Sequence, residues 1–168
     1  MKHLTRALET ASSRSLFVVL YLCLTCVGVL LAGQIAIVLL RYVMGVGFLE
    51  LQDLVTYAFS ALVVLAVPLA YWNGRHVRVD VLSSKLGKRS LTVIERATAL
   101  FLVLPVFGLL LVDAWPLVAN AFAIREGSRE TGGLGGLFLV KGTVIVMGVL
   151  VILIALVSLL GGKVGDDR

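Results

Sequence analysis

The chain has 168 residues, of which 60% are hydrophobic, and its mean hydropathy is +1.05. A soluble domain is typically about 45–50% apolar, so this composition excludes a water-soluble fold and requires lipid around much of the chain. The formal net charge is +5, but the basic residues lie between apolar runs and form no free basic face, which argues against nucleic-acid binding. We therefore predict one all-α integral membrane domain over residues 1–168.

The apolar runs predict four transmembrane helices, since about 20 apolar residues rising 1.5 Å each cross a hydrocarbon core of about 30 Å. The spans cover about residues 16–40, 49–73, 97–124 and 142–162. The segment before them, residues 1–15, has one weakly apolar face. Two interpretations stay open for it: an amphipathic helix lying at the membrane interface, or a frayed tail.

The first span contains both cysteines, Cys23 and Cys26. A C-x-x-C pair is typical of a redox site or of half a metal site. The chain has no second cysteine pair, and desolvation disfavours a thiolate in hydrocarbon, so we interpret both as packing residues and predict no metal or cofactor. The span exceeds the apolar core of a signal peptide, so we expect a retained anchor. Its small residues Gly28, Ala32 and Ala36 recur every fourth position, a spacing that allows close approach of another helix.

The second span opens with two acids after a glycine-broken turn. Arg41 and Tyr42 end the first span, and Glu50 and Asp53 follow the turn. Tyr57 is four residues beyond Asp53, so it shares a helical face with that acid. Two carboxylates are few for a closed cation site, and we expect them to pair with Arg41 across the turn.

The segment after the second span is strongly basic and contains His76, Arg78 and Asp80. His76 has no second histidine or cysteine nearby, so a metal site is not expected. These residues are predicted to cap the helix exit, to contact anionic lipid headgroups or to bind a partner.

The third span carries Asp113, the only acid within an apolar run. An ionisable side chain at membrane depth costs on the order of 3 kcal/mol or more, so it usually has a partner or a task. A proton or cation relay is one hypothesis. A buried polar contact to another helix, or a position near the outer headgroups, is the structural alternative, which we favour. Pro105 and Pro116 are the expected kink sites.

The distribution of positive charge predicts the orientation. Eleven of the 15 Lys and Arg residues flank the two termini and the loop between the second and third spans. Four lie on the opposite side, in the turn near Arg41 and in the glycine-rich loop 125–136 and its flank. Both termini are therefore predicted to be cytoplasmic. No nucleophile–base, zinc-protease or phosphate-loop motif is present, so we do not expect an enzyme.

The central stretch resembles the small membrane subunit of TRAP (tripartite ATP-independent periplasmic) transporters. The matching residues are Arg41-Tyr42, Glu50 and Asp53, and the His-Val-Arg-Val-Asp motif at residues 76–80. Residues 126–133 and Lys141 are similar to the outer loop and the start of the last span in one branch of the family. The Trp that usually precedes the acids is absent, and Asp53 stands where Glu is common, so the resemblance does not specify a substrate.

The resemblance implies a small permease subunit in the bacterial inner membrane. Its implied partners are a large multi-span transport subunit, with which it forms a heterodimer, a periplasmic substrate-binding protein and membrane lipids. The complex would take up an organic acid, driven by a sodium gradient. From the residues and the resemblance together, we predict that eight residues serve the partner interface or the structure: Arg41, Tyr42, Glu50, Asp53, His76, Arg78, Asp80 and Asp113. One alternative remains, an autonomous four-span exporter working as a homodimer around Asp113. A membrane thiol oxidoreductase using the cysteine pair would need a second, shuttling pair, which the two cysteines of the chain exclude.

Overall fold

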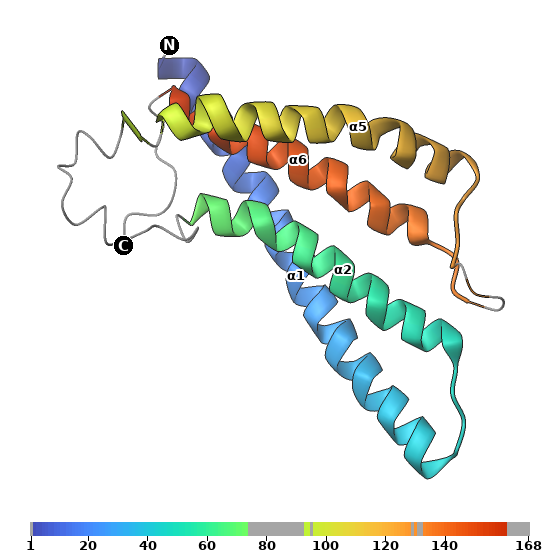
Figure 1. Cartoon of the computed structure of the whole chain (residues 1–168). Helices are drawn as coiled ribbons and strands as arrows, with labels where there is room; N and C mark the ends of the chain where they lie inside the picture. Colours follow the sequence, from blue (N-terminus) through green and yellow to red (C-terminus); the bar gives the residue numbers. More distant parts are fainter. Residues whose placement is uncertain (1, 74–92, 95, 129, 131–132, 161–168) are drawn as a thin grey trace.

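The computed structural model describes residues 2–73, 93–94, 96–128, 130 and 133–160 (Figure 1). The helices are α1 (Lys2–Val43), α2 (Leu49–Trp72), the π-helix η1 (Ala99–Val103), α5 (Leu104–Ala123) and α6 (Leu137–Leu159). Four helical stretches are long and apolar enough to cross a membrane: Leu8–Val43, Leu49–Trp72, Arg96–Ala123 and Leu137–Leu159. The predicted all-α membrane fold with four spans is confirmed.

Helix α1 is a single helix of 42 residues, which is about 63 Å at 1.5 Å per residue. The segment before the first predicted span is therefore continuous with that span and does not form a separate helix. Whether this amino-terminal part lies at a membrane interface stays a prediction.

Helix α6 is the central element of the bundle, since it contacts α1, α2, α5 and η1. Figure 1 shows two helical hairpins, α1–α2 and α5–α6, which meet near the amino terminus and diverge toward their connecting turns. The core lies in the half where they meet. Its central cluster is Val19, Cys23, Leu65 and Leu150, with Leu62, Leu69 and Leu153 packed against it.

The start of the third span contains a π turn, which Pro105 explains. A proline has no N–H to donate, and its ring clashes with the carbonyl four residues earlier in a regular α-helix. The helix widens just before it, and the Leu104 N–H bonds to the Ala99 carbonyl, five residues back. Helix α5 then continues through Pro116 to Ala123.

Gly33, which lies off the predicted small-residue row, makes a close contact between α1 and α2. A Cβ added at Gly33 would lie 2.6 Å from Val55 Cγ2, whereas one at Gly28 would meet nothing within 4 Å. Gly28 and Ala32 are both exposed in this chain. A spacing of four identified a row of small residues, but the buried glycine lies off that row.

Candidate functional site

The eight predicted interface residues fall into separate groups. His76, Arg78 and Asp80 lie outside the described residues. Arg41, Tyr42 and Glu50 lie around the α1–α2 turn, Asp53 lies one turn into α2, and Asp113 lies in α5. The structure therefore does not bring the five described residues together into one site.

Asp53 and Tyr57 hold the loop between α5 and α6 by its main chain. The Leu134 N–H donates to Asp53 Oδ2 at 2.9 Å, and the Tyr57 hydroxyl donates to the Leu134 carbonyl at 3.1 Å. The shared helical face of Asp53 and Tyr57 makes this double contact possible, because residues four apart project to the same side. We call these three residues the loop latch; it joins the start of α2 to the opposite hairpin.

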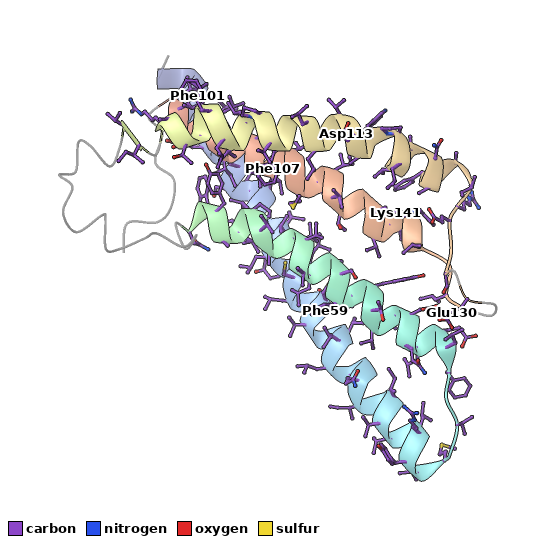
Figure 2. The ribbon with its side chains drawn as sticks, viewed as in Figure 1. Phe59, Phe101, Phe107, Asp113, Glu130 and Lys141 are labelled. Atoms are coloured by element: carbon purple, nitrogen blue, oxygen red, sulfur yellow. The ribbon has the colours of Figure 1, made fainter. Side chains whose placement is uncertain are left out.

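The loop at the latch is tightly turned. An antiparallel bridge joins Gly127 to Gly135, and the Ser128 N–H donates to the Leu134 carbonyl at 3.0 Å. A Cβ at Gly133 would overlap both Asp53 Oδ2 and the Ser128 side chain, so the latch requires a glycine there. Gly136, with φ of 116°, supplies the left-handed turn that starts α6. Figure 2 shows the loop, marked by Glu130, against the start of α2.

An ion pair ties the base of the same loop to α6. Lys141 Nζ lies 2.5 Å from Glu126 Oε2, and each side chain is 23% exposed. Beside it, the rings of Phe122 and Phe138 meet edge to face at a centroid distance of 5.0 Å. The sequence marked Glu126 and Lys141 only as family-like positions. Glu126 lies in the loop and Lys141 in α6, so their pairing depends on how the loop folds and could not be predicted from helical spacing.

Arg41 does not pair with either acid in the structure. It lines a hollow of about 270 Å³ at the α1–α2 turn together with Gly45, Phe48 and other turn residues. Asp53 points instead to the α5–α6 loop, and Glu50 is exposed. Tyr42 is 83% exposed at the end of α1. This turn therefore presents an unpaired cation, an acid and an aromatic ring at the tip of the α1–α2 hairpin, within the part of the chain that the structure describes.

Asp113 is exposed on the outside of α5 and is not buried against another helix of this chain (Figure 2). No hydrogen bond or ion pair involves it within the described ranges. The predicted buried contact therefore does not exist inside the chain itself. The cysteines lie elsewhere: Cys23 packs in the core, as the packing interpretation predicts, and Cys26 is a free, half-buried thiol. The described residues contain no group of three potential metal ligands.

A comparison with protein-family models matches residues 30–162 to the family described as "Tripartite ATP-independent periplasmic transporters, DctQ component". The chain belongs to this family. The match covers about four fifths of the DctQ chain and includes the latch, the Glu126–Lys141 pair and Asp113. The TRAP resemblance of the sequence motifs is thereby confirmed, and the chain is a small membrane subunit of the TRAP type. Searches of curated proteins and of solved structures gave no significant match.

Proposed function

We propose that this DctQ subunit binds the large transport subunit of a TRAP transporter and acts as its fixed scaffold in the membrane. The complex takes up an organic acid that a periplasmic binding protein delivers, and a sodium gradient drives uptake. The family match over residues 30–162 carries this proposal, since it extends from α1 through the other three spans.

The surface of the chain supports an accessory role. Large apolar side chains are exposed along both α1 and α5, including Phe17, Leu31, Ile35, Leu109 and Leu117, each at least 55% exposed. Such surfaces suit lipid or the helices of a larger partner. The described spans are continuous helices, whereas transporter substrate sites are typically formed by broken ones.

We further propose that the chain lies in the bacterial inner membrane with both termini in the cytoplasm. The excess of Lys and Arg at the termini and after α2 supports this orientation. The loop latch and the tip of the α1–α2 hairpin would then face the periplasm, the side from which the binding protein delivers substrate.

Co-purification tests the proposal. The carboxy terminus is tagged, native membranes are solubilised in mild detergent, and the proteins that elute together are identified by mass spectrometry. We expect a much larger multi-span protein in stoichiometric amount, and no transport by the isolated chain in liposomes. A homodimer that transports alone would overturn the scaffold proposal in favour of an exporter.

A further inference from the structure

Asp113 lies on the outside of α5, at a depth close to the midpoint of the membrane-spanning helices. In α6, a Cβ added at Gly148 would lie 2.7 Å from Leu111 Cδ2 of the neighbouring helix α5. Gly148 is the central residue of Leu137–Leu159, so Leu111 marks the middle of α6. Asp113 follows two residues later, about 3 Å along the helix axis.

The length of the third span gives the same depth. That span runs from Arg96 to Ala123, and its midpoint falls between Leu109 and Leu110. Asp113 is about 5 Å from that midpoint at 1.5 Å per residue. Both measures place the carboxyl group well inside a hydrocarbon core of about 30 Å and away from the headgroups.

The surface around Asp113 is an exposed apolar stripe. Leu102, Val106, Leu109 and Leu117 are 61%, 53%, 66% and 55% exposed, and Asp113 stands between the last two at a spacing of four. These five residues, called the α5 stripe, lie along one outward face of η1 and α5. An ionised carboxylate facing lipid at this depth is strongly unfavourable.

The negative charge of Asp113 indicates which kind of surface covers the α5 stripe. Neither the stripe nor any other described residue supplies a cation or a hydrogen-bond donor to Asp113. A second copy of this chain, docked by the same stripe around a twofold axis, would place two carboxylates close together, and like charges there repel. A covering surface with a positive charge of its own would avoid this repulsion and would pair with the carboxylate.

We propose that the α5 stripe docks onto a transmembrane helix of the large transport subunit, and that a basic side chain of that helix pairs with Asp113. This inference rests on the proposed function and adds the face of the chain and the chemistry of its partner. An Arg is the best suited group, since its planar guanidinium can bond both carboxylate oxygens.

Three substitutions at Asp113 test whether its negative charge is needed to bind the large subunit. In the tagged complex, Asp113→Leu and Asp113→Asn should lower recovery of the large subunit by at least about tenfold, because each leaves the partner's cation unpaired. Asp113→Glu should retain most of the recovery. Membrane levels of the tagged chain serve as the folding control, and neither Leu nor Asn makes the span less apolar. Equal recovery for wild type, Leu and Asn variants would overturn the inference.

Photo-crosslinking tests whether the α5 stripe is the face that contacts the large subunit. A photoreactive amino acid at Leu109 or Leu117 should form an adduct with the large subunit. At Trp115, which is 63% exposed on the other flank of α5, it should form little. Two results would overturn this inference but not the proposed function: adducts with a second copy of the chain, or no adduct at Leu109 and Leu117 although the wild-type complex forms. If the wild-type chain recovers no large subunit, the proposed function fails and this inference fails with it.

Discussion

At the scale of single residues, the clearest result is that Asp53 and Tyr57 bind a main chain and not another side chain. The Leu134 peptide donates to one and accepts from the other, so both polar groups of this residue are satisfied by α2. A buried or half-buried peptide left unpaired is costly, and the two side chains remove that cost.

We predict that Asp53→Ala destabilises the purified chain by about 2 kcal/mol, since it removes a hydrogen bond to a charged acceptor. The thermal unfolding midpoint in detergent should fall, and trypsin should cleave faster at Arg125, in the loop that the latch holds. Asp53→Asn is the matched control, because it keeps an acceptor oxygen and should recover much of the loss. Identical midpoints and cleavage rates for Ala and wild type would show that the latch contributes nothing to stability.

The sequence identified Asp53 and Tyr57 as neighbours on one face but assigned Asp53 the wrong partner. Arg41 is near in sequence and opposite in charge, which favoured an ion pair across the turn. The actual donor is a peptide N–H 81 residues away. A main-chain donor has no signature in the sequence, so only the folded loop could reveal it.

At the scale of helices, α1 and α2 approach each other closely at one glycine. Gly33 is buried against Val55, while Gly28, five residues earlier on the same helix, is exposed. Helices without a hydrophobic driving force between them depend on this close packing.

We predict that Gly33→Leu destabilises the isolated chain in detergent by about 1–3 kcal/mol, because the added side chain must push α1 away from α2. Gly28→Leu is the matched control and should not lower the unfolding midpoint, since its Cβ meets no other atoms. The two midpoints are measured by thermal unfolding of the purified variants. Equal losses at both positions would point to the glycine backbone, not to the helix contact.

Helix positions were largely predictable, and local helix geometry was partly so. Long uncharged runs locate the spans because a bilayer tolerates few alternatives to a helix. Pro105 was expected to disturb the third span, and the π turn Ala99–Val103 lies directly before it. The continuity of α1 was not predictable, since the polar residues near its start are equally consistent with a separate interfacial segment.

At the scale of the whole molecule, the arrangement of the spans could not be read from the sequence. All four runs are apolar around most of their circumference, so no periodic face indicates which helix lies at the centre. The structure places α6 there, with Val151, Ile154, Ala155 and Val157 each at most 2% exposed. The two hairpins therefore depend on α6 for their contact.

The orientation of the molecule gives a prediction at this scale. In a background with Cys23→Ala and Cys26→Ala, we expect Glu130→Cys to react with a membrane-impermeant maleimide in cells with a permeabilised outer membrane. A cysteine added after Arg168 should react only after the inner membrane is also disrupted, because the positive charges keep that end inside. The reverse labelling pattern would contradict the proposed topology.

The loop latch has a consequence for sequence divergence. Asp53 and Tyr57 of α2 form hydrogen bonds with the main chain of residue 134 and not with its side chain. Any apolar residue except proline could therefore occupy that position without loss of the contact. Residues 53, 57 and 133 have no such freedom, since their side chains, or the lack of one, make the contact. Over evolutionary time, position 134 should therefore vary more than positions 53, 57 and 133 among chains that keep this loop.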